Sequence, residues 1–312
     1  MKQESAVQEN GFLPNELKEA GISYSLAALF PMLVVFLLML IFQAAFGAGY
    51  ADTDWFKYLS FLVPQVCFAA VCLIFFRRSK TSPRTCYTGC KWHYFLIALV
   101  LQFGLLFSLS ELNVYFIKFL GLFGYKGGNT EEAIPTLSGW NLLPAILVIA
   151  LLPAIFEETL FRGILSGSMQ RRGWGTASTV LISGALFSLF HHNPEQTLYQ
   201  FACGMCFTLV ALRAGSILPT MIAHFANNAL ILCLTAGGIE SMRTALPLGG
   251  YVVLVVVAGL CLAGALFYLL YFERGKNQRG GVKGGGKFFL FAAVGIAVCA
   301  VQWVAMLVEG FK

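Results

Sequence analysis

Long apolar runs separated by short polar loops dominate the pattern of this sequence. Nine runs are long enough to cross a membrane, since a transmembrane helix needs about 20 mostly apolar residues. They cover residues 22–46, 55–76, 94–119, 140–170, 174–192, 197–212, 216–236, 248–272 and 288–311. No run alternates between apolar and polar positions, and lipid requires every backbone polar group to be satisfied internally. The pattern therefore predicts an all-α polytopic membrane protein, a bundle of about nine transmembrane helices.

The composition supports this interpretation. Apolar residues make up 58% of the 312 residues and charged residues only 12%, whereas soluble domains carry about 25% charged residues. A soluble exterior must present polar groups, so a soluble globular protein, a disordered chain and a disulfide-rich secreted domain are excluded. The first apolar run is longer than that of a signal peptide and follows an acidic stretch, so we expect a retained anchor.

The positions of Lys and Arg predict the topology. With the N-terminus inside and alternating helices, 15 of them fall inside, 5 fall outside, and Arg162 lies within a run. The inside set is Lys2, Lys18, Arg77, Arg78, Lys80, Arg84, Lys91, Arg171, Arg172, Arg213, Arg274, Lys276, Arg279, Lys283 and Lys287; the outside set is Lys57, Lys118, Lys126, Arg243 and Lys312. Short cytosolic loops carry this excess. The net charge of +6 therefore indicates topology, and no nucleic-acid partner is expected.

This topology divides the chain into four parts. We expect a cytosolic tail at 1–21, three transmembrane helices within 22–140, a catalytic core at 141–236, and two further helices within 237–312 joined by a basic, Gly-rich loop at 273–287. That loop is typical of a flexible linker. It could touch anionic headgroups, although a simple positive-inside loop is favoured. The protein is expected in a plasma membrane, most consistently a bacterial one.

Most of the nine cysteines lie inside apolar runs and are interpreted as small hydrophobic residues. Cys86, Cys90 and His93 share one basic loop and could bind a metal ion. A fourth ligand is missing nearby, so an ordinary loop is favoured.

The fourth run holds three charged residues, Glu157, Glu158 and Arg162. Each charge near a bilayer centre costs at least about 2.5–3.5 kcal/mol on insertion scales, so such groups are kept for pairing or for function. Glu158 and Arg162 are four residues apart and can pair on one helix face. Glu157 is rotated by about 100° from Glu158 and is free to face another partner. The alternative is one buried ion cluster that locks the helix packing.

Histidines in two other runs extend this chemistry. His191 and His192 end the fifth run, while His224 and Asn228 share one face of the seventh. Helical rise places Glu157, His191 and His224 about 21, 25 and 16 Å from the cytosolic ends of their helices. We therefore expect these three and Asn228 to converge on one polar cavity between the fourth, fifth and seventh helices. Its nearer mouth is expected on the external side, beside residues 193–196.

A carboxylate with two imidazoles suits the activation of water. The glutamate can accept a proton from water as a general base. Alternatively, Glu157, His191 and His224 can hold a zinc ion that acidifies its bound water. The amide of Asn228 can stabilise a developing oxyanion. These residues leave the metal-free and zinc-dependent reactions both open.

Three ordered motifs carry a resemblance to a known family. They are Glu157-Glu158-x-x-x-Arg162, Phe187-x-x-x-His191 and His224-x-x-x-Asn228. Together, over residues 142–235, they resemble the motifs of the CAAX prenyl protease and bacteriocin-processing family, also called CPBP or Abi, which are intramembrane endopeptidases.

The resemblance implies a role for each residue. Glu157 and His191 would activate the attacking water, His224 and Asn228 would support the oxyanion, and Arg162 would orient the carboxylates of Glu157 and Glu158. Members are described both as zinc metalloproteases and as metal-free glutamate proteases, so zinc stays an open cofactor. His192 and Asn227 are neighbouring alternatives to His191 and Asn228, which fit the motif spacing better.

We therefore expect an intramembrane endopeptidase acting on a membrane-embedded or lipidated peptide or protein in the lipid bilayer. A non-catalytic immunity or regulatory protein of the same family is one alternative. A proton-coupled transporter that uses Glu157 and the histidines as a relay is another. Inverted repeats would favour a transporter, and the sequence shows none.

Overall fold

The computed structural model describes residues 15–127, 134–239, 241–273, 276, 280–282 and 284–312, and these form helices and loops without a strand. The first half contains α2 (Glu16–Phe46), α3 (Asp54–Ser79), α4 (His93–Gly104), η3 (Leu105–Leu109), α5 (Ser110–Gly121), α6 (Leu142–Ala145), η6 (Ile146–Leu151) and α7 (Leu152–Glu158). The second half contains η7 (Thr159–Ser166), α8 (Gly167–Arg171), α9 (Thr176–Phe190), α10 (Thr197–Ala214), α11 (Leu218–Ala236), α12 (Met242–Ala245), α13 (Leu248–Phe267), η9 (Tyr268–Phe272) and α14 (Gly285–Glu309). Lys2, Arg274, Arg279 and Lys283 lie outside the described residues.

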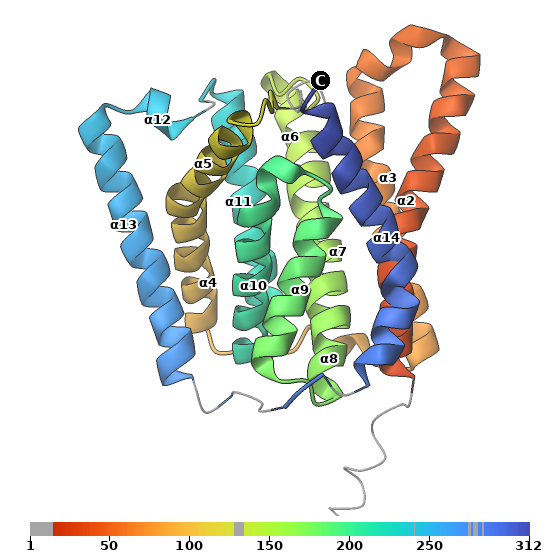
Figure 1. Ribbon diagram of the computed structural model, residues 1–312, viewed down its shortest axis with the longest axis vertical. Coiled ribbons are helices and arrows are strands. Elements are labelled where there is room, and N and C mark those ends of the chain that lie inside the picture. Colours follow the sequence, from red (N-terminus) through yellow and green to blue (C-terminus); the bar gives the residue numbers. More distant parts are fainter. Residues whose placement is uncertain (1–14, 128–133, 240, 274–275, 277–279, 283) are drawn as a thin grey trace, which may run out of the picture.

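Eight helices of the described chain are long and apolar enough to cross a membrane. The fifth expected run, residues 174–192, forms α9, which has only 15 residues and rises about 22 Å at 1.5 Å per residue. It is shorter than predicted because Gly175 before it is extended and His192 after it adopts a left-handed conformation. Figure 1 shows α9 running between its neighbours through the bundle. An integral membrane protein with about nine helices is thereby confirmed.

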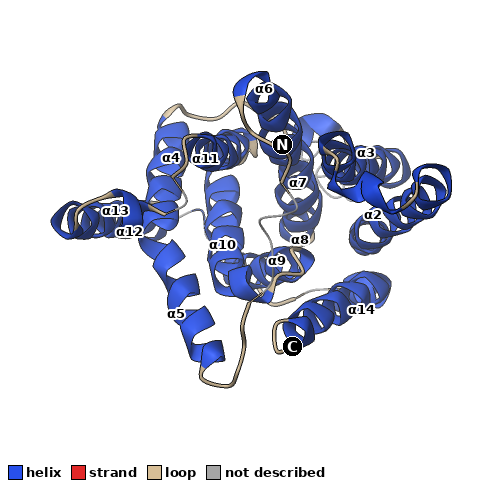
Figure 2. Ribbon diagram, turned by 90° about the horizontal axis from the view of Figure 1, so that it is seen from above, coloured by secondary structure: helices blue, strands red, loops and turns tan. Residues whose placement is uncertain are grey.

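Small residues allow the closest helix contacts. A Cβ atom added to Gly204 in α10 would lie 2.8 Å from the Cα of Gly184 in α9. Likewise, a Cβ on Gly295 in α14 would lie 2.7 Å from the Cα of Ser25 in α2, and the Ser25 hydroxyl donates to the Phe291 carbonyl at 2.7 Å. Small residues commonly permit such approach between membrane helices. Figure 2 shows α2, α3 and α14 gathered on one side of the central α7 and α9.

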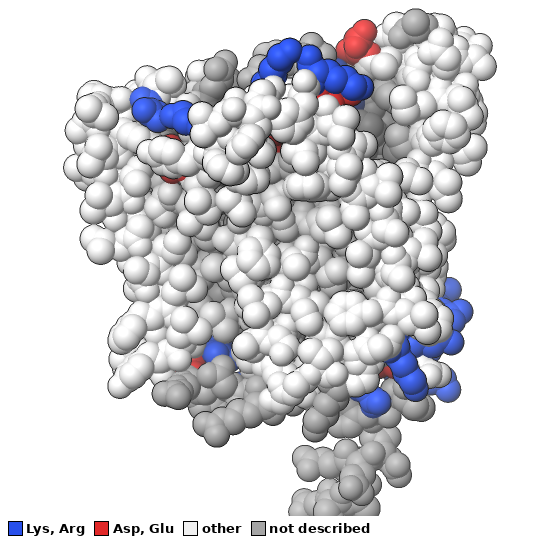
Figure 3. Space-filling model, in the orientation of Figure 1, with Lys and Arg blue, Asp and Glu red and all other residues white. Residues whose placement is uncertain are grey.

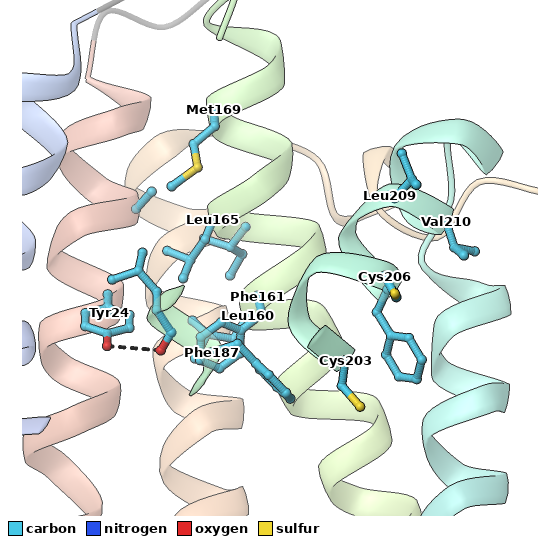
Figure 4. Packing of buried hydrophobic residues seen from close by; sticks show 14 of the residues in the cluster. Tyr24, Leu160, Phe161, Leu165, Met169, Phe187, Cys203, Cys206, Leu209 and Val210 are labelled. Atoms are coloured by element: carbon cyan, nitrogen blue, oxygen red, sulfur yellow. Dashed lines mark hydrogen bonds between the residues drawn. The ribbon is translucent and has the colours of Figure 1, made fainter. Parts of the chain in front are cut away.

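Buried aromatic side chains join α2 to the helices of the second half. The Tyr24 hydroxyl of α2 donates to the Leu186 carbonyl of α9 at 3.3 Å (Figure 4). The ring of Phe161 packs edge-on against Tyr24, at 6.4 Å between centroids, and against Phe187, at 5.0 Å. Such aromatic pairs contribute beyond their buried area. This packing fixes α9, and with it His191, against the helix that carries the glutamates.

Charged side chains cluster at the two ends of the bundle. At the end where α2 begins, Arg171 pairs with Glu16 at 2.7 Å and Arg78 with Glu19 at 2.6 Å. At the opposite end, the Lys126 ammonium donates to the Lys312 carbonyl at 2.8 Å. The face in Figure 3 shows an uncharged band between these ends. These charged residues lie at the ends of the bundle to which the predicted topology assigns them. Which end faces the cytosol stays a prediction.

Cysteine labelling can test that orientation. In a cysteine-free background we expect Lys126→Cys to react with a membrane-impermeant maleimide on intact cells, because its loop is predicted to be external. Arg84→Cys is expected to react only after permeabilisation, since the Lys/Arg bias places its loop inside. Equal labelling of both positions on intact cells would contradict the topology.

Candidate active site

The helix that carries the first motif changes its winding around the two glutamates. The π-helical segments η6 and η7 flank α7, whose last residues are Glu157 and Glu158. Pro153 lies in the first turn of α7, where a missing N–H group is tolerated. All eight residues of η7 are buried. Single π-helical turns are frequent at functional sites, so this irregular stretch marks the centre of the candidate site.

Glu158, Arg162 and His224 form one buried ion cluster. The Arg162 Nη1 donates to the Glu158 Oε1 at 2.9 Å, and both side chains are fully buried. The Nδ1 of His224, from α11, lies 3.0 Å from the same oxygen. Because an ionised carboxylate only accepts hydrogen bonds, this Nδ1 is the donor. The predicted pairing of Glu158 with Arg162 is confirmed, and His224 joins that pair.

Three phenylalanine rings surround the Arg162 guanidinium. Its central carbon lies 4.2 Å from the ring centroid of Phe187, 5.3 Å from that of Phe207 and 6.0 Å from that of Phe161. Its Nε and Nη2 donate no hydrogen bond to the described residues. A desolvated cation over aromatic faces gains about 2 kcal/mol or more. The sequence did not predict these three ring contacts. Phe187 belongs to the second motif, but only helix packing places Phe161 and Phe207 beside Arg162.

Glu157 is rotated by about 100° from Glu158 and lines a cavity of about 510 Å³. His191 and His192 at the end of α9 line the same cavity, as do Gln65 of α3 and Gln302 of α14. The remaining lining is mainly apolar and comes chiefly from α2. Neither His224 nor Asn228 lines it. The 100° turn between the glutamates directs Glu158 to His224 of α11 and Glu157 to the cavity lined by α2 and α3. The convergence of Glu157, His191, His224 and Asn228 on one cavity stays a prediction.

The cavity reaches the lateral surface of the bundle. Met32 and Phe36 of α2 line it and are themselves 39% and 56% exposed. Exposed apolar side chains along a membrane helix face lipid. The expected mouth beside residues 193–196 is not reproduced, because none of these residues lines the cavity. Its wall is instead formed by α2, whose residue Pro31 also lines it.

The hydrogen bonding of His191 sets its tautomer. Its Nδ1 lies 2.8 Å from the Phe187 carbonyl oxygen, and a carbonyl only accepts, so Nδ1 carries the proton. In the neutral ring, Nε2 is then the acceptor. The adjacent His192 has φ of 51° and its buried Nε2 has no partner in the described chain. Both imidazoles line the cavity, so His192 stays an alternative to His191.

The two asparagines of α11 belong to a separate polar chain. Asn228 donates from Nδ2 to the Ile149 carbonyl at 3.2 Å and accepts from Asn227 at 3.0 Å. Asn227 in turn accepts from Gln102 of α4 at 2.5 Å, and Gln102 also donates to the Tyr199 hydroxyl at 3.3 Å. This chain joins α4, α10, α11 and η6. The role of Asn228 as an oxyanion donor stays a prediction.

The donor sets expected for a metal ion are not assembled. Within the part of the chain that the structure describes, no group of three His, Cys, Asp or Glu side chains could hold a metal ion. This covers Glu157 with His191 and His224. It also covers Cys86, Cys90 and His93. Burial raises the pKa of the Cys86 and Cys90 thiols, which disfavours the thiolate that a metal requires.

Comparisons with known proteins agree with the motif pattern. Residues 139–230 match the family model described as Type II CAAX prenyl endopeptidase Rce1-like. The resemblance to the CAAX protease family is confirmed. The chain is also 24% identical over 140 residues to a Bacillus subtilis protein named "Putative membrane peptidase YdiL". That match covers 45% of this chain and 54% of the relative, so the chain spans about half of the relative's length. No solved structure matches.

The matched segment contains all six predicted site residues, from Glu157 to Asn228. It excludes α2, α3 and α14, which supply most of the cavity wall. The candidate active site is thus built by family residues on one side and by helices outside the matched segment on the other.

Replacing Arg162 tests the ion cluster. We expect Arg162→Met to lower the free energy of unfolding by about 3–5 kcal/mol, because it leaves the Glu158 carboxylate buried and unpaired. The double variant Glu158→Gln with Arg162→Met should recover much of this loss, since no net charge then remains at the pair. Thermal unfolding in detergent measures both. A double variant less stable than the single one would contradict the pairing.

Proposed function

We propose that this membrane protein is an intramembrane endopeptidase of the CAAX protease type. Its substrate would be a membrane-associated or lipidated peptide or protein. One observation carries the proposal: Glu157 and His191, from two different helices, line one cavity that reaches the lateral, lipid-facing surface. A base and an imidazole beside such a cavity can activate water for attack on a peptide carbonyl.

The proposed reaction uses two groups that line the cavity, the Glu157 carboxylate and the His191 imidazole. A water molecule between the Glu157 carboxylate and the His191 Nε2 loses a proton to the carboxylate as its oxygen attacks the peptide carbonyl. His191 accepts a hydrogen bond from the same water through Nε2, since its Nδ1 is held by Phe187. When the carbon–nitrogen bond breaks, Glu157 returns the proton to the departing amine. The products are a carboxylic acid and an amine, and the glutamate ends as it began.

The buried cluster supports this base without joining the reaction. Arg162 compensates the charge of Glu158 at 2.9 Å, and His224 ties the same carboxylate to α11 at 3.0 Å. These bonds fix the rotation of α7 about its axis. Because Glu157 is the adjacent residue, fixing Glu158 toward α11 holds Glu157 toward the cavity. Arg162 and His224 therefore act here as positioning residues.

Substitution of Glu157 tests the proposal directly. Purified protein in nanodiscs would be incubated with a solubilised membrane proteome, and new peptide N-termini would be counted by mass spectrometry. We expect Glu157→Gln to reduce cleavage by about 10²–10⁴-fold, the usual contribution of a general base, with unchanged thermal stability. Glu309→Gln, at an exposed carboxylate that pairs with Lys312, is the matched control and should cleave normally. Equal cleavage by Glu157→Gln would reject the water-activating role, and no cleavage by the unmodified protein would favour a regulatory one.

A chelator distinguishes the two mechanisms of the family. The proposed reaction uses no metal ion, because no three His, Cys, Asp or Glu side chains gather to hold one in the described chain. We therefore expect cleavage to persist at its full rate after dialysis against EDTA. Loss of activity that returns with zinc would instead support the zinc-dependent reaction on Glu157, His191 and His224.

A further inference from the structure

Two glutamine side chains face the cavity without full pairing. Gln65 in α3 is 6% exposed, and its Oε1 accepts no hydrogen bond from the described residues. Gln302 in α14 also presents a buried Oε1 without a partner. Both line the cavity that holds Glu157 and His191. Figure 2 shows their helices on either side of α2, which forms most of the apolar wall.

Leaving such groups unpaired is costly. A buried polar atom without a partner loses its hydrogen bonds to water and gains none in return, and native proteins keep few such atoms. The Gln102 Oε1 is also unpaired in the described chain, but Gln65 and Gln302 differ from it in lining the cavity that holds Glu157, where a bound molecule can complete their carbonyl oxygens.

The chemistry of a primary amide identifies the kind of molecule. Each amide offers one acceptor oxygen and two N–H donors, which complements the N–H and C=O groups of a peptide backbone. A helical segment keeps those groups bonded to itself, so only an extended segment has them free. Gln65 lines the same cavity as Glu157, so one amide faces the space that holds the proposed base.

We propose that Gln65 and Gln302 bind the backbone of an extended peptide segment and hold it against Glu157. This inference rests on the proposed peptidase function and adds two substrate-binding residues from outside residues 139–230. The apolar wall of α2 then accommodates the segment's side chains, while the two amides satisfy its backbone. A membrane-embedded substrate must therefore be unwound where it meets the cavity.

Binding can be measured without cleavage. In the Glu157→Gln background, a fluorescent library of random ten-residue peptides would be titrated in detergent micelles and followed by anisotropy. We expect Gln65→Met and Gln302→Met each to raise the Kd by about threefold to tenfold, the loss of roughly one hydrogen bond. In protein with Glu157 intact, the KM of any cleaved peptide should rise by a similar factor with a smaller change in kcat.

Two controls separate binding from structure. Gln43→Met, at an exposed position of the same α2 wall helix, should leave the Kd unchanged. Gln102→Met should lower the Tm, because Asn227 loses its donor, whereas Gln302→Met should not. A library held helical by α-methyl amino acids should bind more weakly than the extended one.

The outcomes distinguish this inference from the proposed function. Glutamine-dependent binding without any cleavage by the unmodified protein would support the inference and reject the peptidase. Cleavage with a Kd and KM that neither glutamine variant changes would overturn the inference alone. Equal binding of the helical library, no binding of either library, or a Tm loss in Gln302→Met as large as in Gln102→Met would also overturn it.

Discussion

The bond between Arg162 and Glu158 is the constraint on which the site depends. Both side chains are fully buried in an apolar bundle, where an unpaired charge costs several kcal/mol. The pair therefore has to form, and His224 has to meet it from α11. Three phenylalanine rings complete the surroundings of the guanidinium. Together these contacts set the rotation of α7 and the distance between α7, α9 and α11.

This constraint gives two adjacent glutamates different environments. Glu158 is fixed by a cation and an imidazole, while Glu157 lines the cavity with His191. The carboxylate of Glu158 thus stabilises the helix packing, whereas the carboxylate of Glu157 is the proposed general base. Both glutamates lie in the α-helical α7, so the ordinary rotation of about 100° per residue is enough to direct them apart. The π-helical turns lie on either side of this helix.

The cavity joins parts of the chain that lie far apart in sequence. Glu157 and His191 lie within the segment that resembles the Rce1-like family, but α2, α3 and α14 form the opposing wall. The close approach of α2 to α14 through Gly295 brings these outer helices together. The proposed catalytic residues therefore lie in the matched segment, whereas most of the cavity wall comes from the flanking helices.

The sequence by itself determined the class of fold and the candidate chemistry. Apolar runs of membrane length are local features, and the Glu158–Arg162 pair follows from a four-residue helical spacing. The family motifs were likewise readable in order along the chain. What the sequence could not decide was which helices meet. His224 pairs with Glu158, Asn228 bonds to Ile149, and Gln65 lines the cavity with Glu157 only because of helix rotation and packing. Apolar runs carry similar side chains on every face, so the sequence does not show which helices pack together. The tertiary structure alone decided that α2, α3 and α14 enclose the cavity.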